Sequence, residues 1–232
     1  MLRELLRAWR MRDPMKNMLR QFDDMLEHAQ WMFTQACAVL EGRADVKDVR
    51  DPVFDRDQNI NELQREIRRE IVTHLSVEPG ANVSACLALM SIVKDAERIG
   101  DYCKNIFDLA EVYDRPLLAG AYSAPLAEIR REILAFFEMT RQAFASSDEA
   151  VAREVVRRKS AISKQVDLLI GQLVRDRLET ADAVAYALLA RHFKRISSHL
   201  ANIASSVYAP LEAIDYSDEP ADPGAGGTAR ER

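Results

Sequence analysis

The sequence predicts an all-α protein made of two tandem three-helix bundles. Only 8 glycines and 8 prolines occur among its 232 residues, whereas β-sandwiches and barrels need turn residues about every 8–12 positions. The longest proline-free stretch runs from Leu126 to Ala209. Apolar residues recur three or four positions apart through most of the chain, which is the spacing of an amphipathic helix. Long helices with short connections favour antiparallel bundles and exclude an all-β architecture.

Proline, glycine and capping residues mark the helix ends in the first half of the chain. Pro14 stands at a favourable first helical position, and Gly42 follows the last apolar residue of that helix. We expect the next helix to follow a polar connection that reaches Pro52, and to end before Pro79-Gly80. The third is expected over about residues 82–113.

The second half repeats this order. A fourth helix is expected over about residues 125–144, and Asp148 provides a cap for the start of a fifth. The sixth is expected over about residues 180–208. The expected domains are a basic amphipathic segment, two three-helix repeats and a disordered tail, at residues 1–13, 14–119, 120–212 and 213–232.

An internal repeat supports this division. The pattern RI-x5-NI begins at Arg98 and again at Arg195, an offset of 97 residues. Both copies lie on the last helix of their half, so each half is one structural unit of the same kind.

Four oxygen-bearing side chains form the candidate site. Glu97 and Asp101 share one face of the third expected helix, and Asp57 and Asn61 share one face of the second. If these helices pack antiparallel, three carboxylates and one amide oxygen meet. Hard oxygen donors suit magnesium, calcium, manganese or iron, and close carboxylates raise one another's pKa unless a cation neutralises them. The alternative is a solvated helix surface on which acids pair with neighbouring basic residues.

The segment ERIGDYCKNIFDLAEVY, from Glu97 to Tyr113, resembles the signature of the PhoU family of phosphate-uptake regulators. The resemblance extends over about residues 16–212 and includes the doubled repeat. It implies two three-helix bundles side by side, often in a dimer, with acidic pairs that bind iron or zinc clusters. It also implies repression of the phosphate-starvation response, between a phosphate ABC transporter and a sensor histidine kinase.

Matched to this family, the first repeat keeps its metal ligands with one change. Glu97 and Asp101 match the acidic pair of the family segment, while Asp57 and Asn61 match the pair on the preceding helix with an amide in place of one carboxylate. The resemblance therefore implies a divalent or iron-type metal cluster, of iron, zinc, manganese or magnesium, in the first repeat.

The second repeat has lost these carboxylates. Lysine or serine stands at all four matched positions, which are Lys159, Ser163, Lys194 and Ser198. An ammonium group cannot ligate a cation, so no metal is expected here. Two interpretations remain. The lysines point to solvent at a decayed site, or they form, with Arg195 and His199, a basic patch that holds phosphate.

The first twelve residues alternate arginines with leucines and carry Trp9. Such a basic amphipathic segment suits peripheral contact with an anionic membrane, a partner transporter or the bundle itself.

The longest apolar run spans about eight residues, whereas a membrane span needs about 20. The three cysteines form no CxxC pair, which suits a reducing compartment. We expect a cytoplasmic protein; where the first twelve residues contact the membrane, they place it peripherally at the inner membrane face.

The expected function is that of a regulatory adaptor. No nucleophile–histidine–acid arrangement and no phosphate-binding glycine loop is evident, so we expect no enzyme. A di-iron carboxylate enzyme needs two Glu-x-x-His pairs, and none of the 4 histidines has a glutamate three positions before it. The net charge of −5 disfavours nucleic acid as a ligand.

The expected partners are a phosphate transporter ATPase, a sensor histidine kinase or both, with the chain as a homodimer. The alternative is a helical scaffold or transporter-accessory protein that binds no metal.

Overall fold

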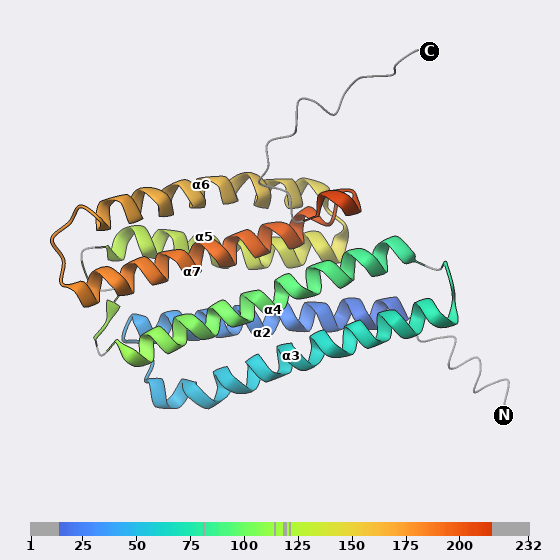
Figure 1. Cartoon of the computed structure of the whole chain (residues 1–232), viewed down its shortest axis with the longest axis horizontal. Helices are drawn as coiled ribbons and strands as arrows, with labels where there is room; N and C mark the ends of the chain where they lie inside the picture. The colour runs from blue at the N-terminus through green and yellow to red at the C-terminus, as the bar shows by residue number, and fades with distance from the viewer. Residues whose placement is uncertain (1–13, 81, 114, 118–119, 121, 215–232) are drawn as a thin grey trace, which may run out of the picture.

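The computed structural model describes residues 14–80, 82–113, 115–117, 120 and 122–214. The expected amphipathic segment at residues 1–13 lies outside the described residues, as does the expected tail from residue 215 onward. Within the described part the chain forms long α-helices and no strand, so the all-α prediction is confirmed (Figure 1). The helices are α2 (Pro14–Leu40), α3 (Val46–Val77), α4 (Val83–Val112), α5 (Ser123–Ser146), α6 (Glu149–Leu173), α7 (Thr180–Ser205) and the short 3-10 helix η2 (Leu211–Ala213).

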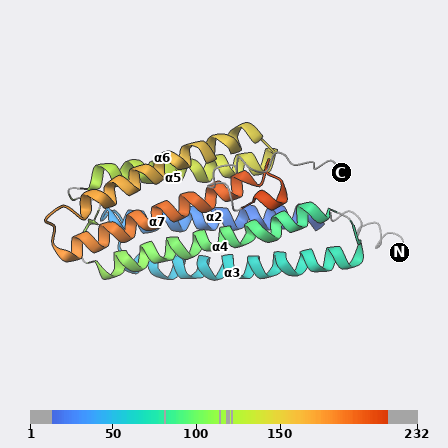
Figure 2. The same cartoon turned by 45° about the horizontal axis from the view of Figure 1, so that its top comes forward.

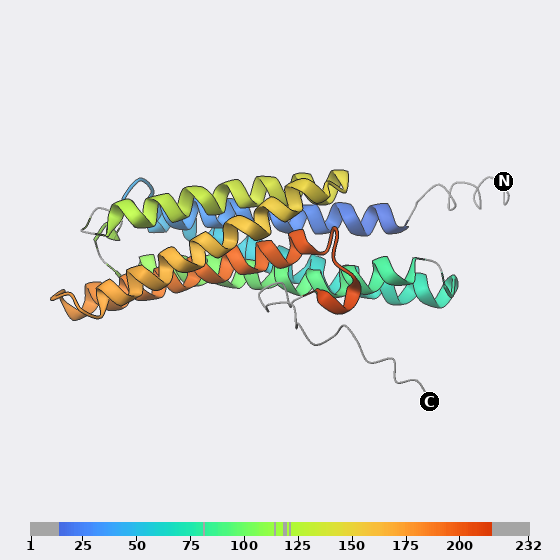
Figure 3. The same cartoon turned by 90° about the horizontal axis from the view of Figure 1, so that it is seen from above.

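The long helices form two three-helix groups side by side. α2, α3 and α4 pack on one another, and α5, α6 and α7 do the same (Figures 1 and 2). Successive helices run in opposite directions, so the molecule is elongated along the helix axes. The groups are joined where α4 lies against α7 and where α2 lies against α5 (Figure 3). None of the described helices has the length of apolar sequence needed to cross a bilayer.

The start of α3 differs from the sequence prediction. The helix was expected at Pro52 but begins at Val46, and Pro52 lies inside it. Asp45 caps this earlier start, since its carboxylate accepts a hydrogen bond from the Lys47 N–H at 2.9 Å. Only the carbonyl one turn before Pro52 loses its donor, and Val49 and Val53 are buried on either side of the proline. The Asp45 cap and the burial of Val49 and Val53 therefore outweigh the tendency of Pro52 to mark the start of a helix.

One hydrophobic core runs through both groups of helices. Phe33 of α2 meets Phe137 of α5 and Phe193 of α7, with ring centroids 5.9 and 5.5 Å apart. The methionines of the first helix belong to this core, and Met18 and Met25 are fully buried. Because the core is shared, the faces of α3, α4, α6 and α7 that carry the candidate residues are held in fixed relation to one another.

Candidate functional site

The predicted acidic residues lie on two adjacent antiparallel helices. Asp57 and Asn61 belong to α3, and Glu97 and Asp101 belong to α4. Gly100 lets the helices approach closely at this point, because a Cβ atom added to it would lie only 2.9 Å from Ile60 Cδ1. The four predicted residues therefore lie on two helices that pack closely at Gly100 and Ile60.

The three carboxylates influence one another through space. Burial raises the pKa of Asp57, and the Asp101 carboxylate raises it further. The pKa of Asp101 is raised in the same way, first by burial and then by Glu97. Burial is the larger cause of both shifts, and the carboxylate neighbours add to it because negative charge is concentrated on the α3–α4 face.

Basic neighbours compensate part of that charge. Lys94 Nζ lies 2.5 Å from Glu97 Oε2, and Arg98 Nη1 lies 3.8 Å from Asp101 Oδ2. Among the residues that the structure describes, no group of three or more His, Cys, Asp or Glu side chains is arranged to hold a metal ion. The arrangement is therefore a charged cluster in which Glu97 and Asp101 already form ion pairs with basic neighbours.

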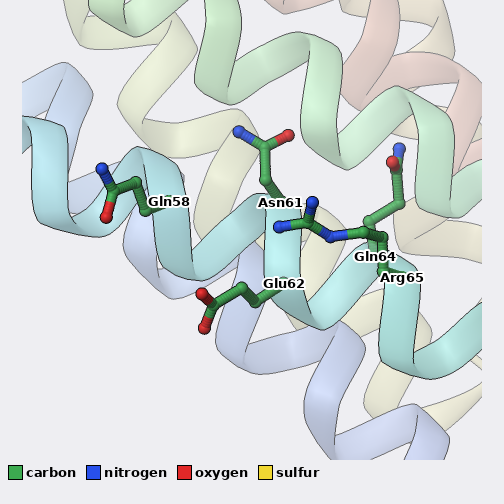
Figure 4. A pocket seen from close by; sticks show the side chains of 5 residues that line it. All are labelled: Gln58, Asn61, Glu62, Gln64 and Arg65. Atoms are coloured by element: carbon green, nitrogen blue, oxygen red, sulfur yellow. The ribbon is translucent and has the colours of Figure 1, made fainter.

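Asn61 also lines a small hollow on α3. This hollow, of about 320 Å³, is lined by five side chains of α3, which are Gln58, Asn61, Glu62, Gln64 and Arg65. Figure 4 shows Asn61 and Gln64 pointing toward the neighbouring helix. The Asn61 amide nitrogen donates to the Asp57 carbonyl oxygen at 3.0 Å, so its amide oxygen is the atom that remains to meet a cation.

In the second repeat, the lysines and serines at the matched positions also come together. Lys159 and Ser163 on α6 and Lys194 and Ser198 on α7 all line one hollow of about 370 Å³. The interpretation that both lysines point to solvent is wrong for Lys159, whose residue is only 6% exposed. The burial of Lys159 depends on how α6 packs against its neighbours, which the sequence alone does not reveal.

His199 is not part of this hollow, which corrects the predicted patch. Its Nδ1 lies 2.6 Å from Oδ1 of Asp95 on α4, and both residues are buried. The Asn202 amide also donates to that oxygen, at 3.4 Å. Sequence analysis missed Asp95. The available signal was an acidic residue within the apolar stripe that includes Ile92 and Ile99.

Tyr102 is a second residue at the α4–α7 contact to which the sequence assigned no role. Its ring stacks on His199 and also contacts His192, with centroids 5.7 Å apart in each case. Its hydroxyl accepts a hydrogen bond from Arg195 Nε at 3.1 Å. Burial, and to a smaller degree Arg191, lowers the pKa of His192. Tyr102 thus ties the acidic face of α4 to the basic face of α7.

Comparison with known proteins identifies the family to which this arrangement of helices belongs. The family model described as the PhoU domain matches the chain twice, over residues 22–110 and 126–207. The chain belongs to the PhoU family. The resemblance seen in the segment from Glu97 to Tyr113 is therefore confirmed, and the two matches coincide with the α2–α4 and α5–α7 groups.

Curated PhoU relatives are distant in sequence. The phosphate-specific transport system accessory protein PhoU homolog of Xylella fastidiosa (strain Temecula1) is 25% identical over 184 residues, which cover 74% of this chain and 75% of that protein. The homolog of Deinococcus radiodurans is 38% identical over 50 residues, a local match to 22% of this chain and 23% of that protein.

Solved PhoU structures share the fold. PhoU from Pseudomonas aeruginosa superposes with a TM-score of 0.74 at 22% identity, covering 84% of this chain and 95% of that one. The phosphate transport system regulatory protein PhoU from Streptococcus pneumoniae gives 0.69 at 18% identity, covering 85% and 96%. At these identities the PhoU structures establish the fold alone.

Proposed function

We propose that this chain is a cytoplasmic regulator of phosphate uptake that acts by protein contact rather than by catalysis. The observation that carries the proposal is the match of the PhoU domain to both halves of the chain. Relatives aligned over most of their length are named as accessory proteins of the phosphate-specific transport system. Its proposed partners are the ATPase of a phosphate transporter, a sensor histidine kinase or both, met at the inner face of the membrane.

The architecture is consistent with this role. Long helices with a shared core present rigid, elongated faces on which a partner can bind. A homodimer of the chain would present each face twice. Size-exclusion chromatography with light scattering measures that assembly state directly.

Affinity capture from phosphate-replete cells tests the adaptor function. The tagged full chain is expected to recover a phosphate transporter ATPase or a sensor kinase. Deletion of the gene is expected to raise the output of a phosphate-starvation reporter in phosphate-rich medium. Recovery of neither partner together with an unchanged reporter would contradict the proposal.

We further propose that Asp57, Asn61, Glu97 and Asp101 hold a divalent or iron-type cation in the first repeat. The raised pKa values of Asp57 and Asp101 support this, because a cation would relieve the repulsion that helps to cause them. The oxygen donors are of the kind that hard cations prefer. Ligation through Glu97 Oε2 would compete with its ion pair to Lys94. A bound cation would neutralise this face and tie α3 to α4.

Metal analysis of the purified chain tests this second proposal. The native protein is expected to retain metal after desalting, and the Glu97→Ala/Asp101→Ala variant is expected to lose it. The matched control is Asp55→Ala/Glu66→Ala, which removes two exposed acids from α3. Absence of metal from the native protein would favour the alternative of a metal-free scaffold or transporter-accessory protein.

A further inference from the structure

We propose that the second repeat binds a small phosphate-type oxyanion in the hollow between α6 and α7. This α6–α7 basic hollow has a volume of about 370 Å³, and its cationic lining residues are Lys159, Lys164, Arg191, Lys194 and Arg195. It occupies the positions that correspond to the acidic face of the first repeat. The inference does not depend on the proposed regulatory function, since it concerns a ligand and not a partner.

Positive charge in the hollow exceeds the negative charge that lines it. Asp167 is the one carboxylate among the described lining residues, and it pairs with Lys194 at 2.6 Å. Lys164 and Arg191 are exposed and form no ion pair with any described residue. Cations that line one hollow repel one another and favour an anion between them.

One of these cations is held in position from the other repeat. Arg195 donates from Nε to the Tyr102 hydroxyl at 3.1 Å. Because its guanidinium has five N–H donors in a rigid plane, the remaining donors can still bind an oxyanion. A fixed guanidinium loses less side-chain entropy on binding than a free one.

Hydroxyl groups complete the donor set. Ser160, Ser163 and Ser198 line the same hollow. Ser163 Oγ is buried and has no hydrogen-bond partner among the described residues. A buried hydroxyl without a partner is uncommon in a folded protein, and an oxyanion in the hollow would satisfy it.

The combination of ammonium, guanidinium and hydroxyl donors selects the ligand class. Phosphate oxygens accept charge-assisted hydrogen bonds from all three groups. A hollow of about 370 Å³ has room for inorganic phosphate or pyrophosphate. The substitution of carboxylates by lysine and serine has therefore reversed the charge of the site, from one suited to a cation to one suited to an anion.

Isothermal titration of the full chain with inorganic phosphate and with pyrophosphate tests the proposal. The variant Lys164→Ala/Arg191→Ala removes the two exposed cations, and it is expected to weaken binding by about tenfold or more. The matched control is Lys47→Ala/Arg69→Ala, which removes the same charge from exposed positions on α3. The control is expected to bind as the native chain does. Circular dichroism verifies that all three proteins are folded.

A parallel sedimentation arm separates soluble phosphate from a lipid headgroup. Vesicles of phosphatidylglycerol are compared with vesicles of phosphatidylcholine. Sedimentation with the first alone, lost in Lys164→Ala/Arg191→Ala and kept in the control, supports the same oxyanion chemistry with a lipid as its source. The proposal is overturned if neither arm shows binding, or if the variant and the control bind equally well.

Discussion

The carboxylate of Asp95 and the imidazole of His199 meet at 2.6 Å in the buried contact between α4 and α7. They lie 104 residues apart in the chain and belong to different repeats. Beside them, Tyr102 stacks on His199, and these two residues occupy matched positions of the repeat. Residues at equivalent positions meet at the contact because α4 and α7 are equivalent helices packed antiparallel.

Removal of the Asp95 carboxylate is predicted to loosen this contact. In Asp95→Ala the buried His199 Nδ1 loses its partner, which costs about 1–3 kcal/mol of unfolding free energy. Asp95→Asn keeps an oxygen acceptor and is expected to retain most of the stability. Urea denaturation followed by circular dichroism measures both variants. Equal losses in the two variants would show that the hydrogen bond to His199 contributes little.

His192 is predicted to make stability depend on pH. Its pKa in the folded chain is lowered from the ordinary value of 6.5, first by burial and then by Arg191. Below that value the unfolded chain takes up a proton that the folded chain does not. The free energy of unfolding therefore falls as the pH drops below 6.5 and is fully present above it.

The variant His192→Gln isolates this contribution. Urea denaturation at about pH 7.5 and about pH 5.5 is expected to show a smaller loss on acidification than in the native chain. His28, whose pKa is also lowered by burial and by Arg56, keeps its own contribution in both proteins. An unchanged difference between the two pH values would mean that His192 titrates alike in the folded and unfolded chains.

Phe33 is predicted to stabilise both helical groups at once. It is fully buried and contacts Phe137 of α5 and Phe193 of α7. Phe33→Ala is expected to cost about 3–5 kcal/mol, because a cavity opens where three helices meet. The control Val112→Ala, at a residue that is 85% exposed, is expected to change stability by less than about 0.5 kcal/mol. A single unfolding transition in both variants would support one shared core, whereas two separated transitions for Phe33→Ala would contradict it.

The helices themselves were predictable from local signals. Glycine, proline and capping aspartates act on neighbouring backbone, so residues such as Gly42 and Asp148 define the ends of α2 and α6 correctly. Pro52 misled the prediction because the tolerance of a proline depends on how near it lies to a helix start. That distance is set by Asp45, a cap the sequence analysis did not weigh.

Contacts between the two repeats could not be predicted from local sequence patterns. The repeat offset shows that Tyr102 and His199 are equivalent, but it does not say which helix faces pack together. The burial of Lys159 likewise depends on the packing of α6 against its neighbours. Side-chain spacing therefore predicted the acidic face of α3 and α4, while the Asp95–His199 pair required the three-dimensional arrangement.

The position of Gly100 is predicted to limit the size of the side chain that fits between α3 and α4 at the acidic face. The terminal methyl of Ile60 already lies 2.9 Å from where a Cβ would stand. Gly100→Ala gains about 1 kcal/mol of helix propensity and needs only a shift of that flexible methyl, so its net effect is expected to be small. Gly100→Leu overpacks the contact and is expected to cost about 1–3 kcal/mol.

The double variant Gly100→Leu/Ile60→Ala tests whether this steric contact is the cause. Truncation of Ile60 frees volume beside the new leucine, so the double variant is expected to be more stable than the sum of the two single effects. Urea denaturation of the four proteins gives the coupling energy. Ser197, which matches Gly100 in the second repeat and donates to the Lys194 carbonyl at 2.8 Å, already carries a Cβ there. If the two single effects are strictly additive, the cost of Gly100→Leu does not arise from contact with Ile60. The close approach of α3 and α4 would then not be the reason for a glycine at position 100.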